Sequence, residues 1–493
     1  MQPREALRQY FGHSDFRRGQ RKLIEAVLGG RDVLGVMPTG GGKSMCYQIP
    51  ALCLGGTTLV ISPLISLMKD QVAALTDAGV PAGYINSSLS GEELRDVYRR
   101  AYNGEYRLLY VAPERLGAPG FVKLAQTISI PLIAVDEAHC ISQWGQDFRP
   151  SYLEIADFID ALPQRPVTAA FTATATARVQ EDIGRLLRLR GPLCEVTGFD
   201  RPNLYFEVRT PRSKNGTLLA LVRERVGRCG IVYCATRAAV ERVCQSLQDA
   251  GIPATRYHAG LDEEERRRNQ DDFQFDRRTV MVATNAFGMG IDKSNVSYVI
   301  HYNMPKSLEA YYQEAGRAGR DGEPADCILL FAPADVETAR FLIDNGGSDA
   351  LSEEEAALVR RRDMERLQAM VGYCRTAKCL RGYILDYFGQ PHADACGSAE
   401  DITTHAQMIL SCAVRIRDAL GYGVGKTLLI QVLRGSRDQR VLQLRLDKLP
   451  TYGLLAELPE SAVRARVEYL EMEGYLKTDP DHGALLLTPH ARE

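Results

Sequence analysis

Short apolar runs rich in β-branched residues alternate with helical patterns from residue 20 to about residue 200. This alternation predicts a parallel sheet covered by helices, because parallel strands are buried on both faces and read as continuous apolar segments. A second series begins near residue 204, after a loop at residues 198–203, so we expect two α/β domains in tandem. Strands are expected at residues 33–36, 58–62, 108–112, 132–135, 168–172, 229–234, 279–283, 298–302 and 327–331.

The pattern changes after the second series. Residues 352–388 are rich in Glu, Arg, Leu and Met and predict a separate helical unit. Helical patterns near 406–420 and 461–473 are followed by two short strand-like runs around a turn in 475–488, an order typical of a winged helix. We therefore expect an α/β fold class with four parts, at residues 1–203, 204–340, 341–402 and 403–493.

Charge and composition limit the binding partners and the cellular compartment that we expect for the chain. The 493 residues contain 60 Lys and Arg against 62 acidic residues, so any nucleic-acid contact must come from a local basic patch. The N-terminus lacks the apolar core of a signal peptide, and no apolar run approaches the roughly 20 residues that span a bilayer. The scattered cysteines suit buried thiols in a reducing compartment. We expect a cytoplasmic protein associated with a bacterial nucleoid.

The first candidate for chemistry is a phosphate-binding loop, Met37-Pro-Thr39-Gly40-Gly41-Gly42-Lys43-Ser44, between a predicted strand and a predicted helix. Backbone N–H groups of such a loop surround an anion at a helix N-terminus. Lys43 can then reach the outer phosphates of a nucleotide, and Ser44 can hold Mg²⁺. A glycine-rich turn without a ligand is the alternative.

Two carboxylates follow another strand. Asp136 and Glu137 in Asp-Glu-Ala-His come directly after the apolar run 132–135, at the carboxyl end of the predicted sheet. There Asp136 can hold Mg²⁺ while Glu137 orients or deprotonates the attacking water. A helix cap is the alternative, which the phosphate loop upstream disfavours.

Two arginines of the second series stand beside glycines, Arg317 and Arg320 in Gln313-Glu-Ala-Gly-Arg-Ala-Gly-Arg. An arginine placed against the γ-phosphate stabilises the charge that develops in phosphoryl transfer. The alternative is a surface-exposed pair. With two α/β domains, an arginine supplied from the second domain makes hydrolysis depend on domain closure.

These segments, in this order, resemble a superfamily 2 helicase and more narrowly a RecQ-type DNA helicase. The resemblance extends over nearly the whole chain and implies two RecA-like domains. It also rests on segments at residues 16–20, 62–70, 112–115, 172–174, 257–260 and 283–292.

The resemblance implies further site residues. Arg17 and Gln20 would recognise the adenine of ATP, His13 stands where an aromatic residue stacks on that base, and Gln313 joins the nucleotide site. Residues 140–150 resemble an aromatic-rich loop that binds single-stranded DNA. The side chains expected to contact DNA there are Trp144, Phe148 and Arg149. Many relatives carry His at the position of Gln146, and a buried aromatic is the alternative for Trp144.

The zinc unit of such helicases is only half present. The resemblance places two cysteine ligands at Cys379 and Cys396, but Ala399 and Ile402 occupy the two other ligand positions. Cys374, His392 and His405 are near enough in sequence to be considered as substitute ligands, but no familiar spacing joins them. Because a structural zinc ion needs four donors, we expect no zinc and a unit held by helix packing.

The last ninety residues resemble the winged helix of the family. Arg434 and Arg437 belong to a basic cluster suited to phosphate contacts, with a solvated face as the alternative. His482, at the turn of the expected hairpin, is a candidate for stacking on a base pair. We expect no further helical module after the winged helix, such as the HRDC domain of longer relatives.

The resemblance implies an ATP- and Mg²⁺-dependent DNA helicase that unwinds duplex DNA in the 3′ to 5′ direction, in recombination and repair. The expected partners are single-stranded and forked duplex DNA and a single-strand-binding protein. One alternative is a DNA-stimulated ATPase that translocates or anneals strands without unwinding. Another is a DNA-binding protein with an inactive ATPase.

Overall fold

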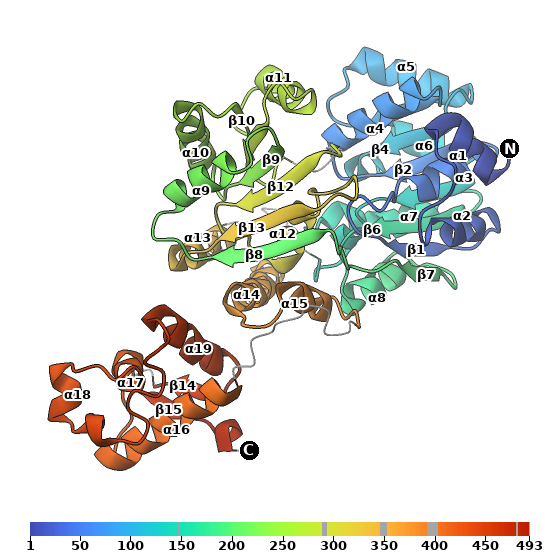
Figure 1. Cartoon of the computed structure of the whole chain (residues 1–493). Coiled ribbons are helices and arrows are strands. Elements are labelled where there is room, and N and C mark those ends of the chain that lie inside the picture. Colours follow the sequence, from blue (N-terminus) through green and yellow to red (C-terminus); the bar gives the residue numbers. More distant parts are fainter. Residues whose placement is uncertain (146, 288–292, 346–352, 392–402, 480–481, 493) are drawn as a thin grey trace. The chain divides into compact units, whose positions relative to one another are not determined.

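The computed structural model describes residues 1–145, 147–287, 293–345, 353–391, 403–479 and 482–492 (Figure 1). The chain forms two compact units. One joins Met1–Met370 with Ile384–Pro391, and the other joins Val371–Tyr383 with His392–Glu493. In the described part of the chain, we find no helix with the length and apolar character needed to cross a membrane.

The first lobe of the larger unit is built on a seven-stranded parallel sheet with the order β3-β4-β2-β5-β6-β1-β7. Its central strands are apolar and buried along almost their whole length, as expected for strands with helices on both faces. The strands are β1 (Val33–Val36), β2 (Thr58–Ile61), β3 (Ala82–Ile85), β4 (Leu108–Val111), β5 (Leu132–Val135), β6 (Val167–Thr172) and β7 (Leu193–Val196).

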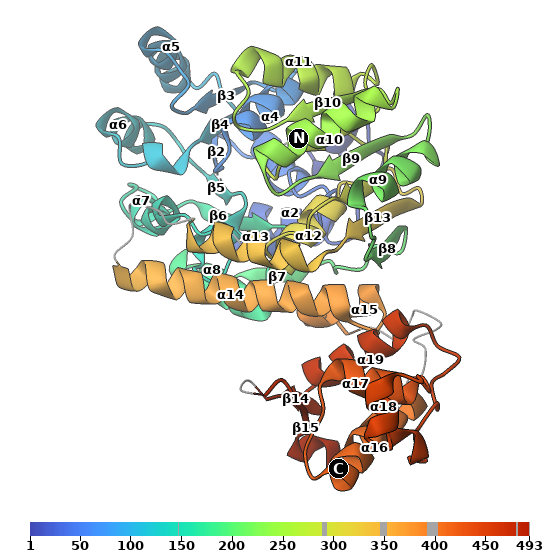
Figure 2. The same cartoon turned by 90° about the vertical axis from the view of Figure 1, so that its left-hand side faces the viewer.

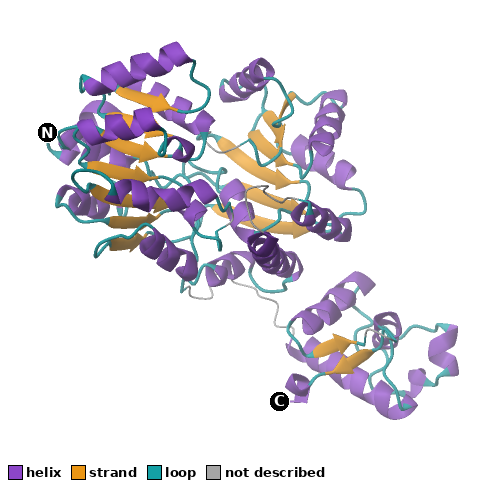
Figure 3. Ribbon diagram, turned by 180° about the vertical axis from the view of Figure 1, so that it is seen from behind, coloured by secondary structure: helices purple, strands orange, loops and turns teal. Residues whose placement is uncertain are grey.

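Helices flank the strands of this sheet, as Figure 3 shows. Phe171 of β6, Tyr47 of α3 and Leu23 of α2 belong to one buried core that joins helices to the sheet. The helices are α1 (Pro3–Phe11), α2 (Gln20–Leu28), α3 (Met45–Cys53), α4 (Ile65–Asp77), α5 (Gly91–Tyr102), α6 (Pro119–Thr127), α7 (Ile155–Asp160) and α8 (Ala177–Leu186). Short 3-10 helices are η1 (Pro113–Arg115), η2 (Ala138–Ile141) and η3 (Pro150–Glu154).

The second lobe has the same architecture as the first. It is built on a six-stranded parallel sheet with the order β10-β11-β9-β12-β13-β8. Its strands are β8 (Leu204–Arg209), β9 (Cys229–Tyr233), β10 (Ala254–Tyr257), β11 (Val280–Ala283), β12 (Val296–His301) and β13 (Ala325–Leu330). Its helices are α9 (Lys214–Arg223), α10 (Arg237–Asp249), α11 (Glu263–Gln274), α12 (Leu308–Ala315) and α13 (Pro333–Asp344).

Two helices follow the second sheet, where the sequence predicts a helical unit. They are α14 (Glu353–Arg375) and α15 (Leu380–Tyr387). Figure 2 shows α14 as one long helix, most of which belongs to the larger unit. Phe388, just after α15, stacks on Phe199 of the loop between the lobes with a centroid separation of 4.3 Å. This stacking ties the helical segment to the loop that connects the two sheets.

The smaller unit contains the helices and the hairpin predicted for a winged helix. Strands β14 (Leu476–Thr478) and β15 (Leu485–Leu487) pair antiparallel. Buried Leu429, Val463 and Leu476 belong to the core that joins helices and hairpin. The helices are α16 (Thr403–Leu420), α17 (Lys426–Leu433), α18 (Gln439–Gln443), η4 (Leu446–Lys448), α19 (Glu460–Met472) and η5 (Pro489–Arg492).

The sequence pattern located the interior strands of both parallel sheets to within two residues and missed the strands at their edges. The missed strands β3, β7, β10 and β8 are the two outer strands of each sheet. An edge strand has a neighbour on one side only and is less buried, so its sequence carries no continuous apolar run. The expectation of two α/β domains with parallel sheets is confirmed.

Candidate active site

The phosphate loop runs from the end of β1 to the start of α3. Gly42 has a φ of +75°, and a Cβ at this position would lie 2.4 Å from Nε2 of Gln20. The positive φ favours glycine, and a Cβ at this position would also displace the Gln20 amide. Ser44 is the N-cap residue of α3, and Lys43 Nζ lies 3.4 Å from the carbonyl oxygen of Met37. An anion at this helix N-terminus would meet backbone N–H groups and the lysine ammonium.

The residues expected to recognise adenine lie against this loop, with one exception. Gln20 donates from Nε2 to the carbonyl oxygen of Gly42 at 3.0 Å, and its Oε1 accepts from the backbone N–H of Arg17 at 2.8 Å. Arg17 donates from Nη1 to the carbonyl oxygen of Gly40. His13 is exposed in the segment between α1 and α2. Arg17 and Gln20 therefore contact the phosphate loop, and their role in adenine recognition stays a prediction.

The sheet order β5-β6-β1 brings three strand ends together. Asp136 and Glu137 follow β5, Thr172 ends β6, and Met37 follows β1. His139 Nδ1 lies 2.8 Å from Thr172 Oγ1, and the backbone N–H of Met37 donates to the Thr172 carbonyl at 3.0 Å. Thr172 therefore connects the Asp-Glu-Ala-His segment to the phosphate loop. Glu137 has a φ of +46°, a strained backbone of the kind found at functional sites.

The two carboxylates differ in their electrostatic surroundings. Burial and the negative charge of Glu137 raise the pKa of Asp136. Burial also acts on Glu137, but a hydrogen bond with His139 and the charge of Lys43 outweigh it and lower the pKa of Glu137. Glu137 is therefore a carboxylate at neutral pH. The oxygens of Asp136 and Ser44 are hard donors that fit Mg²⁺, whose charge would offset the repulsion between the carboxylates.

The arginine-bearing segment follows α12 in the second lobe and faces the phosphate loop. Arg317 is 6% exposed, and its positive charge contributes to the lowered pKa of Glu137. A Cβ at Gly40 would lie 3.3 Å from Cγ of Arg320, so the stem of this arginine packs on the phosphate loop. Gln313 lies on α12 one turn before Arg317. The structure therefore brings Arg317 and Arg320 to the candidate site from the opposite lobe.

Sequence reasoning missed Arg201, in the loop between the lobes. Its guanidinium donates to the carbonyl oxygens of Thr39 in the phosphate loop and of Gly319 in the arginine-bearing segment. Both acceptors are backbone atoms, which leave no signature in the sequence. Only the hydrogen bonds in the structure identify this residue.

The aromatic-rich loop after η2 is held by arginines from two helices. The guanidinium carbons of Arg178 in α8 and Arg362 in α14 lie 3.1 and 3.8 Å from the Trp144 ring centroid. Arg362 donates to Gln143 Oε1 at 2.8 Å, and Arg366 donates to the Trp144 carbonyl at 2.9 Å. Burial and the charge of Arg178 lower the pKa of Arg362. Sequence reasoning did not find these three arginines, because two of them lie more than 200 positions away.

Arg149 is engaged within the first lobe. It donates to the Pro63 carbonyl at 2.9 Å and pairs with Asp147, with 3.0 Å between Nη2 and Oδ2. In this arrangement its guanidinium anchors the aromatic-rich loop to the end of β2. Gln146, whose departure from the family pattern was noted, lies outside the described residues.

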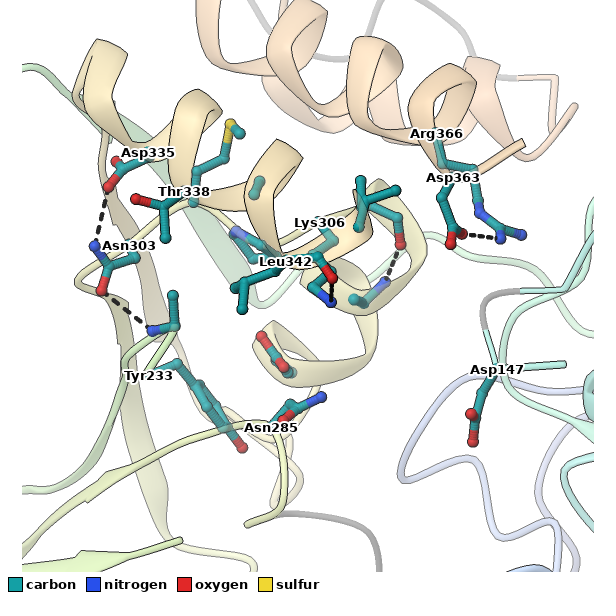
Figure 4. Close-up of a pocket in the computed structure, with 18 of the residues that line it drawn as sticks. Asp147, Tyr233, Asn285, Asn303, Lys306, Asp335, Thr338, Leu342, Asp363 and Arg366 are labelled. Carbon is teal, nitrogen blue, oxygen red and sulfur yellow. Dashed lines mark hydrogen bonds and ion pairs between the residues drawn. The ribbon is translucent and has the colours of Figure 1, made fainter. Parts of the chain in front are cut away.

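A cavity of about 740 Å³ opens beside the aromatic-rich loop. Asp147 and Phe148 line it from the first lobe, and Asn285, Asn303 and Lys306 line it from the second. Figure 4 shows Asp147 across the cavity from Asn285, and the paired Asp363 and Arg366 of α14 on another side of it. The cavity therefore presents an aromatic ring, amides and a lysine, which can contact bases and phosphates, together with acidic side chains such as Asp335 and Asp344.

The candidate DNA residues of the smaller unit differ in exposure. Arg437 is exposed at its surface, whereas Arg434 is half-buried and donates from Nε to the Leu458 carbonyl at 3.1 Å. The His482 side chain is 80% exposed beyond β14, and its Nδ1 lies 3.1 Å from Asp479 Oδ2. Arg437 and His482 are thus accessible, and Arg434 also braces the fold.

Of the four expected zinc ligand positions, only Cys379 lies within the described residues. Cys379 is disulfide-bonded, unlike the free thiols that the sequence predicts. Cys396, Ala399 and Ile402 lie outside the described residues. Where the structure is described, no group of three or more His, Cys, Asp or Glu side chains is arranged to hold a metal ion.

Sequence profiles of four known families match the chain in order. They are the DEAD/DEAH box helicase over residues 17–183, the helicase conserved C-terminal domain over 213–322, the RecQ zinc-binding family over 333–410 and the RQC domain over 398–493. Together they account for both lobes, α14 and α15, and the smaller unit.

Solved structures share the fold at low sequence identity. Dbp5 of S. cerevisiae bound to RNA and ADP BeF3 matches with a TM-score of 0.56 and 19% identity, over 74% of this chain and 97% of that one. Helicase Lhr of Mycobacterium smegmatis bound to ssDNA and AMP-PNP matches with a TM-score of 0.55 and 18% identity, over 98% of this chain and 60% of that one.

Curated relatives are much closer in sequence. The ATP-dependent DNA helicase RecQ of Bacillus subtilis is 45% identical over 96% of this chain and 79% of its own length. The protein of the same name from Haemophilus influenzae is 41% identical over 91% of this chain and 72% of its own length. With these relatives and the four matching families, the chain belongs to the RecQ family of ATP-dependent DNA helicases.

Proposed function

We propose that this helicase hydrolyses ATP between the phosphate loop of the first lobe and the arginine-bearing segment of the second. Thr39 and the glycines Gly40, Gly41 and Gly42 surround the phosphates, and Lys43 contacts the outer ones. The observation that carries the proposal is the packing of Arg320 on Gly40, because it joins the two halves of the site within one unit.

The water that attacks the γ-phosphate is activated by Glu137. The lowered pKa keeps this carboxylate ionised at neutral pH, so its oxygens can accept a hydrogen bond from the attacking water and orient it. The hydrogen bond between His139 and Thr172 fixes the segment that carries Glu137. Arg317 and Arg320 donate to the phosphate oxygens as charge develops on them.

Mg²⁺ would be held by the Ser44 hydroxyl and by Asp136, directly or through water. When bound, it neutralises charge on the β- and γ-phosphates. Arg17 and Gln20 recognise adenine, and their hydrogen bonds to Gly40 and Gly42 link base recognition to the loop that binds the phosphates. We propose His13 and Gln313 as further residues that contact the nucleotide.

Single-stranded DNA contacts the aromatic-rich loop through Trp144 and Phe148. Two guanidinium groups lie against the Trp144 ring, so a base must displace at least one of them in order to stack there. Burial and the nearby charge of Arg178 lower the pKa of Arg362, and the repulsion between the two guanidinium groups favours this release. Arg149 is a further proposed DNA contact, and its bonds to Asp147 and to the Pro63 carbonyl tie the loop to the end of β2.

We propose 3′ to 5′ unwinding of forked duplex DNA in recombination and repair, with a single-strand-binding protein as a partner and the bacterial nucleoid in the cytoplasm as the location. Arg434 and Arg437 contact duplex phosphates, and His482 meets the first base pair. We propose that the domain boundaries lie after residues 203, 340 and 402. Because two of the four zinc ligand positions hold Ala399 and Ile402, we propose that this member binds no structural zinc.

DNA-stimulated release of phosphate from ATP tests the ATPase part of the proposal. The parent protein should hydrolyse ATP faster with single-stranded DNA, and Lys43→Ala should abolish this stimulation while thermal unfolding stays unchanged. Phosphate release that DNA does not stimulate, or that survives unchanged in Lys43→Ala, would refute the proposed site.

A further inference from the structure

Arg201 connects two segments that lie far apart in the sequence. Its Nη1 donates to the Thr39 carbonyl at 3.1 Å and to the Gly316 carbonyl at 3.4 Å. Its Nη2 donates to the carbonyl oxygens of Ala318 at 3.1 Å and Gly319 at 2.9 Å. One side chain therefore contacts the phosphate loop of the first lobe and the backbone on both sides of Arg317 in the second.

A neighbouring amide supports the same segment. Asn203 donates from Nδ2 to the carbonyl oxygens of Gly319 and Glu323, both at 2.9 Å. Gly319 has a φ of +58°, and a Cβ there would lie 2.4 Å from Asn203 Nδ2. The backbone between Arg317 and Arg320 thus follows a path that requires glycine and is held from the loop between the lobes.

We propose that Arg201 is a positioning residue for ATP hydrolysis, which sets the arginine-bearing segment against the phosphate loop. The inference rests on the proposed roles of Arg317 and Arg320 at the γ-phosphate. Arg201 acts through the backbone that carries those two arginines. Its bonds to Gly316, Ala318 and Gly319 stay within the second lobe and its own loop, whereas its bond to Thr39 needs the two lobes in their present arrangement.

The side chain at this position must be arginine rather than lysine. A guanidinium carries five N–H donors in a planar fork, so it can reach acceptors on two sides at once. A lysine ammonium presents its three donors from a single point and can satisfy one segment or the other. Arg201→Lys therefore keeps the positive charge but cannot bond to the phosphate loop and to the arginine-bearing segment at the same time.

The test is steady-state ATP hydrolysis at saturating single-stranded DNA by Arg201→Ala and Arg201→Lys. We expect kcat to fall about 10- to 100-fold in the alanine variant, because small displacements of positioned groups cost rates of this order. KM for ATP should change less than about threefold, because the arginines act mainly as charge develops in the transition state. The lysine variant should lie between the alanine variant and the parent.

Arg31→Ala is the matched control. Arg31 also donates to two backbone carbonyls, those of Gly191 and Pro192, but it is exposed and lies away from the phosphate loop. Its kcat should equal that of the parent. This control separates the loss of any arginine-to-backbone contact from the loss of the link between the lobes.

A kcat for Arg201→Ala equal to that of the parent, or a rise in KM with unchanged kcat, would overturn the inference. If the alanine variant does not fold, Arg201→Lys decides, and parental kcat in that variant overturns it equally. Different results would refute the proposed function itself. In that case the parent would show no DNA-stimulated hydrolysis, or Arg317→Ala would retain the parental kcat.

Discussion

Replacing Asp32 with alanine will destabilise the first lobe at the start of β1, the strand that leads into the phosphate loop. Asp32 is 3% exposed and accepts hydrogen bonds from both terminal nitrogens of Arg165, at 2.8 and 3.2 Å. It also accepts from the backbone N–H groups of Thr168 at 2.9 Å and Arg190 at 2.7 Å. One carboxylate therefore joins β1 to β6 and to the segment before β7.

The expected cost follows from the groups that would lose a partner. Removing one member of a buried ion pair costs about 3–5 kcal/mol. The Arg165 side chain is 17% exposed and also donates to the Arg188 carbonyl, so it can partly recover its interactions. We therefore take the lower end, about 3 kcal/mol, which lowers the Tm of a lobe of this size by about 6–12 °C.

The assay is thermal unfolding followed by tryptophan fluorescence, because the single tryptophan, Trp144, lies in the first lobe. Glu25→Ala is the control. It removes an i,i+4 pair with Arg21 whose side chains are 57% and 61% exposed, and such a pair contributes only about 0.3–0.5 kcal/mol. A Tm for Asp32→Ala that falls no further than the control's would refute the reasoning.

The pH dependence supplies a second check on Asp32. Burial alone would raise its pKa, but the hydrogen bonds from Arg165, Thr168 and Arg190 outweigh burial and lower it. A carboxylate with a lowered folded-state pKa contributes stability above its unfolded pKa of about 3.9, and this contribution is lost as the pH falls through the folded value. The Tm difference between parent and variant should therefore be full at pH 7 and shrink below about pH 4.

Four further variants and measurements test other parts of the account. Glu137→Gln should lower kcat for ATP by about 100- to 10,000-fold and leave nucleotide affinity within threefold, in hydrolysis and equilibrium binding assays. Trp144→Ala should weaken single-stranded DNA binding by about 5- to 150-fold in fluorescence anisotropy, as expected for loss of ~1–3 kcal/mol of base stacking. Arg437→Ala should reduce the salt dependence of duplex binding by about one phosphate contact. Metal analysis of the purified protein should find no stoichiometric zinc, and a full equivalent that is lost in Cys379→Ala would contradict this expectation.

The sequence predicted those parts of the fold whose burial leaves a continuous pattern. β1 and β5 are buried along their whole length, and their positions were predicted to the residue. β7 alternates between half-buried and exposed positions, and β10 is only partly buried, so neither stands out from a helix or loop. An edge strand is stabilised mainly by pairing with a neighbouring strand. That neighbour is distant in the sequence, so the local pattern of residues does not reveal the pairing.

Some residues of the candidate site could be predicted from the sequence, and others could be found only in the structure. Lys43, Asp136 and Arg317 carry the chemistry in short segments next to strands or helices, and the sequence indicates them directly. Arg201 and Arg362 act through contacts with residues more than 100 positions away, and three of the four backbone acceptors of Arg201 are carbonyls of Gly or Ala. Long-range contacts of this kind follow from the sheet topology and the path of α14, which the sequence pattern alone does not provide.

The central claim is that ATP hydrolysis at this site drives strand separation in the 3′ to 5′ direction. The most direct measurement compares unwinding of partial duplexes that carry a 3′ or a 5′ single-stranded tail, by the parent protein and by Glu137→Gln. We predict ATP-dependent separation by the parent from the 3′-tailed duplex only, and none by the variant. DNA-stimulated hydrolysis without strand separation, or equal unwinding from both tails, would contradict the account.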